Sequence, residues 1–300
     1  MSSLTTYATP ADLAAISNLE LLAQQVVEGF AAGLHRSPHK GFSVEFKEHR
    51  QYVVGDELRR LDWKVFGKSD RFYIREYEQE TNLRCTLVLD RSGSMAYRGS
   101  TAIHSKFDYA IRLSACLGYL MLQQQDAVGV MTFDTELRSF IPPRSRPAHL
   151  SAILDILAKE KPGADTDMAE AFDSLVPKIP PRGLLVLISD CFGEINELLH
   201  SLAFLRSRRH EVLVFQIWDR DELDFPFYER ARFDSLELPE QLMIDPAHLR
   251  DTYLAELGRF RKELQDKCYT NRVTLVPLVT DEPYGKGLAQ YLGLRKGRRR

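Results

Sequence analysis

The sequence has little cysteine, no long apolar segment and no excess of either charge. No apolar stretch approaches the roughly 20 residues that a membrane-spanning helix needs, and the first residues lack the basic and apolar parts of a secretory signal. The four cysteines are far apart and form no C-x-x-C pair: Cys85, Cys116, Cys191 and Cys268. Thiols in apolar segments act as small hydrophobic side chains, so we expect a reducing, cytoplasmic compartment.

The charges are nearly balanced, with 40 basic and 42 acidic residues in 300 and a formal net charge of −2. Nucleic-acid-binding domains are usually strongly basic, so this balance argues against a general nucleic-acid binder. The one basic run, residues 295–300, is interpreted as a solvated chain end. No G-x-G-x-x-G motif follows a predicted strand, which argues against dinucleotide binding.

Short apolar runs dominate the chain after residue 84. They are rich in Val, Ile and Leu on both faces, as buried parallel strands are, and they cover residues 85–89, 127–133, 184–189, 212–218 and 273–279. Helical patterns cover residues 107–121, 150–157, 168–175, 195–205 and 249–264. This alternation predicts an α/β fold with a doubly wound, mainly parallel, Rossmann-like sheet.

The first 80 residues have a different texture. Residues 9–35 carry the broad apolar face of a helix, whereas residues 42–80 are short mixed segments that include a half-buried strand at 72–78. We therefore expect an N-terminal α+β segment (1–80), an α/β domain (81–285), and a C-terminal helix end with a basic tail (286–300).

Polar side chains follow two of the predicted strands. Asp90 ends one strand and begins a D-x-S-x-S loop with Ser92 and Ser94. Asp190 ends another strand, and Thr166 precedes a predicted helix. Ligands of open α/β sheets bind beyond the carboxyl ends of the strands, so we expect these side chains to converge there.

Two carboxylates and three hydroxyls suit a hard divalent cation. We expect Mg²⁺, with Mn²⁺ or Ca²⁺ as alternatives. The carboxylates would neutralise the ion and leave one coordination position open, to which an acidic side chain of a partner protein would bind. The pattern therefore predicts a metal-dependent recognition site.

Three other interpretations remain open. Asp or Ser after a strand is commonly a helix cap, and a module without metal would keep the same residues as a vestige. A Mg²⁺-dependent hydrolase or phosphatase could use Asp90 as its nucleophile. Phosphatases of the D-x-D type have a second Asp where this chain has Ser92, and no lysine is found in a matching loop, so we expect a non-enzymatic protein.

The D-x-S-x-S, Thr and Asp set resembles the metal-ion-dependent adhesion site of von Willebrand factor A-like domains, and residues 85–280 resemble such a domain throughout. Upstream, His35–Phe46 and Glu48–Lys64 are similar to the signature of the family called domain of unknown function 58, with its R-x-Y-x-x-G-D-x-x-R-x-x-D-W core. Members are typically encoded beside MoxR-type AAA+ ATPases. The resemblance implies an adaptor that works with such an ATPase in protein assembly or activation.

Two departures and one further surface accompany this resemblance. Arg91 places a positive charge close to the expected metal, where it would weaken cation affinity or attract the acid of a partner. Ser189-Asp190-Cys191 replaces the commoner Thr-Asp-Gly. Within the signature, a predicted short helix carries four candidate partner-binding residues: Arg59, Arg60, Asp62 and Trp63. Their alternative role is structural, with the Trp packed on the sheet domain and the charges paired.

Overall fold

The structure is a computed structural model that describes residues 10–36, 49–51, 67, 72–75, 83–163, 178–179, 182–229, 231–236 and 241–298. The chain forms two compact units, one of residues 31–82 and one of residues 1–30 together with 83–300. In the smaller unit, β1 (His49–Gln51) pairs antiparallel with β2 (Tyr73–Arg75). The N-terminal residues up to 30 thus group with the sheet unit.

The larger unit is built on a six-stranded sheet in the described part of the chain, in the order β10-β7-β6-β3-β4-β5. The strand bounds are β3 (Arg84–Asp90), β4 (Ala127–Phe133), β5 (Leu137–Arg144), β6 (Leu184–Ser189), β7 (Glu211–Trp218) and β10 (Thr274–Val279). All neighbouring strands are parallel except β4 and β5. The predicted doubly wound, mainly parallel sheet is confirmed.

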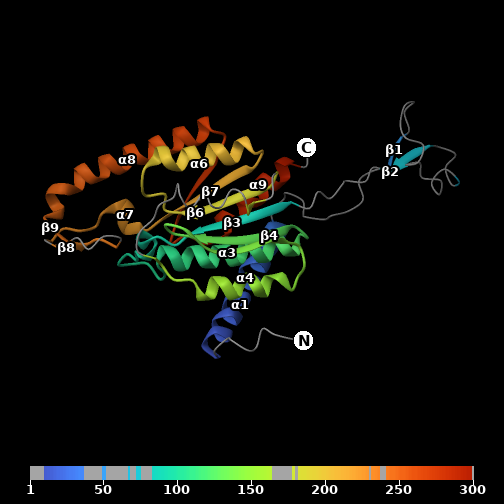
Figure 1. The fold of residues 1–300 in the computed structure, drawn as a ribbon, viewed down its shortest axis with the longest axis horizontal. Helices are drawn as coiled ribbons and strands as arrows, with labels where there is room; N and C mark the ends of the chain where they lie inside the picture. Colours follow the sequence, from blue (N-terminus) through green and yellow to red (C-terminus); the bar gives the residue numbers. More distant parts are fainter. Residues whose placement is uncertain are drawn as a thin grey trace. The chain divides into compact units, whose positions relative to one another are not determined.

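Helices cover both faces of this sheet (Figure 1). One side carries α6 (Ile195–Ser207) and α8 (Pro246–Thr270), which contact β7, β10 and each other. On the other side, α3 (Lys106–Gln123) contacts the sheet, α4 (His149–Lys159) and α9 (Gly285–Arg298). The predicted N-terminal helix is α1 (Pro10–Arg36), in which Ala23 and Val27 are buried.

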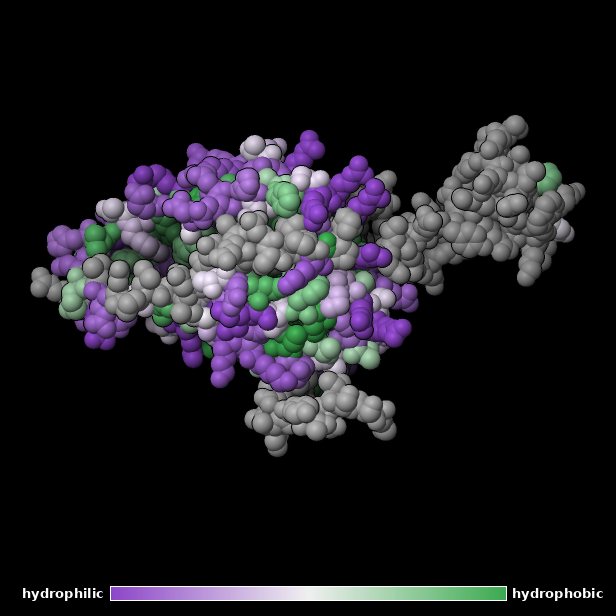
Figure 2. Space-filling model, in the orientation of Figure 1, coloured by the Kyte–Doolittle hydropathy of each residue, from purple (hydrophilic) through white to green (hydrophobic). Residues whose placement is uncertain are grey.

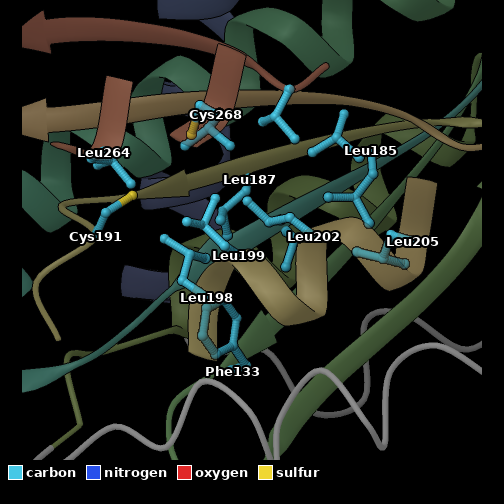
Figure 3. Close-up of a cluster of buried hydrophobic side chains, with 14 of the residues drawn as sticks. Phe133, Leu185, Leu187, Cys191, Leu198, Leu199, Leu202, Leu205, Leu264 and Cys268 are labelled. Carbon is cyan, nitrogen blue, oxygen red and sulfur yellow. The ribbon is translucent and has the colours of Figure 1, made fainter. Parts of the chain in front are cut away.

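The core follows from the apolar strands. Every residue of β6 is buried, which requires cover on both faces. One buried cluster joins β6 and β7 to α6 and to the C-terminal half of α8, and it includes Cys191, Leu264 and Cys268 (Figure 3). Figure 2 shows mainly hydrophilic side chains on the described surface of one face, with apolar residues in smaller patches between them.

Some elements escaped the sequence patterns. The antiparallel edge strand β5 contains Pro142 and Pro143, which are tolerated at a sheet edge but mask the strand pattern. The short hairpin of β8 (Ala231–Asp234) and β9 (Gln241–Ile244) also lacks a long apolar run. No helix among the described residues is both long and apolar enough to cross a bilayer.

Candidate functional site

The candidate site lies where the winding of the sheet reverses. From β3 the chain moves first to β4 and later crosses to β6 on the opposite side of β3. Such a reversal opens a crevice beyond the strand ends. Asp90 is the last residue of β3, and Asp190 follows directly after β6, which is paired in parallel with β3. Both aspartates are only 1% exposed.

Asp90 accepts a hydrogen bond on each of its two carboxylate oxygens. The backbone N–H of Ser92 donates to Oδ1 (2.8 Å), and the hydroxyl of Ser189 donates to Oδ2 (2.5 Å). Burial, followed by the nearby charge of Asp190, raises the pKa of Asp90 to about 7, although these hydrogen bonds oppose the rise. Ser189 was not among the predicted site residues, although it directly precedes Asp190 in the sequence.

The two serines of the D-x-S-x-S loop lie side by side. Their hydroxyls are hydrogen-bonded to each other, with Oγ atoms 3.0 Å apart, and Ser92 is the N-cap of the short 3-10 helix η2 (Gly93–Ala96). Adjacent oxygens around an octahedral Mg²⁺ are also about 3 Å apart, because each lies about 2.1 Å from the metal at right angles to the other. The spacing of the hydroxyls therefore fits two neighbouring coordination positions. Ser94 is half-buried, whereas Ser92 is buried.

Asp190 also has a donor on each oxygen. The N–H of Phe192 donates to Oδ1 (3.1 Å), and the ammonium of Lys106 donates to Oδ2 (2.8 Å). The next residue, Cys191, has φ 59°, in the left-handed region that favours glycine. The turn that glycine usually makes after this aspartate is thus made by a buried cysteine, whose N–H donates to Ser189 Oγ (2.9 Å).

Lys106 is the main component that the sequence analysis missed. It is the first residue of α3, its side chain is fully buried, and its Nζ also donates to Glu222 Oε1 (2.5 Å). Burial by itself lowers the pKa of Lys106, but the charges of Asp190 and Glu222 outweigh it and raise the pKa. One feature of the sequence could have pointed to Lys106. A lysine directly after the helix cap Ser105 is unfavourable for the helix dipole, which suggests that it has another role. The expectation that no lysine lies in a loop matching that of a phosphatase stays a prediction, because Lys106 belongs to a helix and pairs with Asp190 rather than Asp90.

Glu222 belongs to a second group of carboxylates, which it forms with Asp219 and Asp221. Asp219 and Asp221 belong to the start of α7 (Arg220–Asp224), after β7. Gly99 N–H donates to Asp219 Oδ2 (3.0 Å), and Ser100 N–H donates to Asp221 Oδ2 (2.6 Å). These bonds fix the segment that joins the D-x-S-x-S loop to Lys106.

Arg91 is bound to acids of its own chain. Its Nη1 lies 2.9 Å from Glu160 Oε2, and its Nε lies 3.4 Å from Asp134 Oδ2. Glu160 in turn accepts hydrogen bonds from the hydroxyls of Thr132 (2.8 Å) and Ser139 (2.7 Å). The Arg91 side chain is 20% exposed, and its role toward a partner stays a prediction.

The four donors that can be placed fit a hard cation. Each carboxylate oxygen of Asp90 and Asp190 accepts a hydrogen bond that orients it, and a carboxylate has about four lone-pair sites in all, so it can bind a metal as well. Among the described residues there is no group of three or more His, Cys, Asp or Glu suited to a metal, so this set depends on hydroxyls. The remaining predicted residues lie outside the described part: Thr166, Arg59, Arg60, Asp62 and Trp63.

Known proteins resemble the chain in sequence and in fold. The model of the family described as "Protein of unknown function DUF58" matches residues 48–263. The uncharacterized protein Rv1480 of Mycobacterium tuberculosis is 27% identical over 288 residues, which cover 94% of this chain and 89% of that protein. A protein of Mycobacterium bovis, Mb1516, matches with the same identity and coverage.

Solved structures match the chain at low sequence identity. An aerotolerance-related membrane protein from Bacteroides fragilis has a TM-score of 0.48 and 16% identity, over 70% of this chain and 98% of that chain. The VWA domain of SpRpn10 has a TM-score of 0.40 and 9% identity, over 69% of this chain and 95% of that chain. The doubly wound fold itself is established by the strand order of this chain.

Proposed function

From the membership of this chain in the DUF58 family, which the match over residues 48–263 establishes, and from the donors at its strand ends, we propose that it is a metal-ion-dependent protein-binding module. The carrying observation is the pair of Ser92 and Ser94 hydroxyls, 3.0 Å apart and next to the buried Asp90. Such a pair has the spacing of two neighbouring ligands of Mg²⁺.

The metal would be held by Asp90, Ser92, Ser94 and Asp190, with Thr166 as the fifth predicted donor. A bound divalent ion would supply one open coordination position with affinity for a carboxylate. The protein's own residues prepare this site: Ser189 and the Ser92 N–H orient Asp90, while Phe192 N–H orients Asp190. An acidic side chain of the partner protein is the complementary ligand.

For the partner we propose a MoxR-type AAA+ ATPase, or a protein on which such an ATPase acts, because of the family resemblance. In this role the chain would serve as an adaptor in protein assembly or activation. The four cysteines are free and buried, which supports a reducing, cytoplasmic compartment. The candidate surface of Arg59, Arg60, Asp62 and Trp63 would add a second contact.

A hydrolase that uses Asp90 is the alternative, and Lys106 is the observation in its favour. Aspartyl-nucleophile phosphatases need a lysine near the acid, and Lys106 binds the neighbouring Asp190. Against it, Asp90 is only 1% exposed, so a substrate has little access to it. An assay with an aryl phosphate and Mg²⁺ distinguishes the two, since turnover that is lost in Asp90→Asn would favour the hydrolase.

The binding function is tested by metal titration and partner capture. We expect saturable Mn²⁺ binding by the wild type and its loss in Asp190→Asn, which keeps the shape of the side chain. Asp155→Asn is the matched control, because Asp155 lies on α4 in a surface ion pair with Lys159. Capture of a MoxR-type ATPase that persists with chelator, or in Asp190→Asn, would refute the metal-dependent mechanism.

A further inference from the structure

Lys106 places a permanent cation beside a proposed metal ligand. Its side chain is fully buried, and its Nζ bridges Asp190 Oδ2 (2.8 Å) and Glu222 Oε1 (2.5 Å). We propose that Lys106 is a resident cation that shares Asp190 with the divalent ion, keeping the metal-free site folded and the divalent affinity low. This inference rests on the proposed metal-dependent function and says how the metal affinity of that site is set.

Without metal, Lys106 is the charge that stabilises the site. Asp190 and Glu222 are largely removed from water, with side chains 1% and 12% exposed. Removal of one partner from a buried ion pair leaves the other charge uncompensated, which is strongly destabilising. A protein that lacks Lys106 should therefore depend on a divalent ion to compensate Asp190.

With metal, the same ammonium opposes binding. A metal on either oxygen of Asp190 would lie within about 7 Å of Nζ, given the 2.8 Å bond to Oδ2 and a metal–oxygen distance of about 2.1 Å. In a buried site two cations at this separation repel each other appreciably. Lys106 also occupies one of the lone pairs of Asp190, so it competes for the ligand as well as repelling the ion.

The bridge connects the site to another element. Glu222 accepts from the Asp219 N–H through Oε2 (2.8 Å) in the capping box of α7, and the Tyr253 hydroxyl of α8 donates to the Glu222 carbonyl (2.9 Å). A purely structural role for Lys106 would be to hold α3 and α7 together. Such a role predicts lower stability on substitution, but it does not predict tighter metal binding.

The test compares Lys106→Met with Lys159→Met in the full chain. Lys159 pairs with Asp155 on the surface of α4, so its variant controls for the loss of a lysine. Mn²⁺ affinity is measured by calorimetric or spin-resonance titration, and thermal unfolding is followed with Mn²⁺ and with chelator. We expect Lys106→Met to bind Mn²⁺ at least about tenfold more tightly than the wild type, with a lower Tm in chelator and a larger rise on adding Mn²⁺.

A Lys106→Met protein that is folded only with Mn²⁺ would support the inference. If that variant fails to fold under all conditions, the double variant Lys106→Met/Glu222→Gln removes the second unpaired carboxylate, and the same tightening is expected. Lys106→Arg keeps the charge and should keep the low affinity.

Unchanged or weaker Mn²⁺ affinity in the folded variant without the lysine would overturn this inference while leaving the metal site intact. Failure of the proposed function gives a different result. In that case neither the wild type nor the Lys106 variants would bind Mn²⁺ in a way that Asp190→Asn abolishes.

Discussion

The buried carboxyl of Asp90 should make the stability of the metal-free protein depend on pH. Its pKa is raised from 3.8 to about 7, by burial first and by Asp190 second. Because the folded state holds the proton more tightly than the unfolded state, the protonated group stabilises the fold below pH 4. This contribution is lost as the pH rises to about 7, and neighbouring Glu222, whose pKa burial also raises, acts in the same direction.

The size of the effect follows from the shift. One bound proton changes the free energy of unfolding by about 1.4 kcal/mol per pH unit, so the shift corresponds to a loss of up to about 4 kcal/mol between pH 4 and pH 7. The wild type and Asp90→Asn, which cannot titrate, should therefore differ in slope over this range. The Asn variant keeps one acceptor for the Ser189 hydroxyl but turns an amide NH2 toward the Ser92 N–H, so we expect a loss of stability that does not depend on pH and compare only the slopes.

Urea denaturation in chelator at pH 5, 6, 7 and 8 measures this difference. We expect the wild type to lose stability relative to Asp90→Asn as the pH rises, and to regain it above pH 7 when Mn²⁺ is added, because the metal binds the ionised carboxylate. The Glu222→Gln variant separates the second contribution. Parallel stability curves for the wild type and Asp90→Asn would refute the assignment of Asp90 as a buried, proton-retaining ligand.

Three substitutions test the supports of the site. Ser189→Ala removes the hydroxyl donor to Asp90 and should cost about 1–3 kcal/mol in urea denaturation, moving the pH midpoint upward; an unchanged midpoint would contradict this. Gly99→Ala would put a methyl group 2.0 Å from a carboxylate oxygen at the start of α7, so we expect a loss of about 1–3 kcal/mol by overpacking. Its control, Gly258→Ala, has no atom within 4 Å of the new methyl and should be neutral or stabilising, and equal effects would refute the argument. Arg91→Ala leaves Glu160, whose side chain is 7% exposed, without its cation. We expect the free energy of unfolding to fall by about 2 kcal/mol or more. An unchanged thermal unfolding curve would show that this ion pair does not stabilise the protein.

The sequence determined the parallel sheet and the two aspartates at the carboxyl ends of its strands. The apolar runs at 127–133 and 184–189 coincide with β4 and β6. Strands buried on both faces leave this local signature, because each of their side chains has to be apolar. Asp90 and Asp190 stand out for the same reason, since a carboxylate directly after such a run is costly to bury unless it has a role.

Only the tertiary structure decided what surrounds these aspartates. Lys106 is separated from Asp190 by 84 residues and from Glu222 by 116, and no local pattern links the three. Its ion pairs exist because parallel crossovers bring the start of α3, the end of β6 and the start of α7 together at the carboxyl ends of the strands. The sequence shows which groups can carry charge, whereas the packing of distant elements sets which charges meet away from water and therefore how they act.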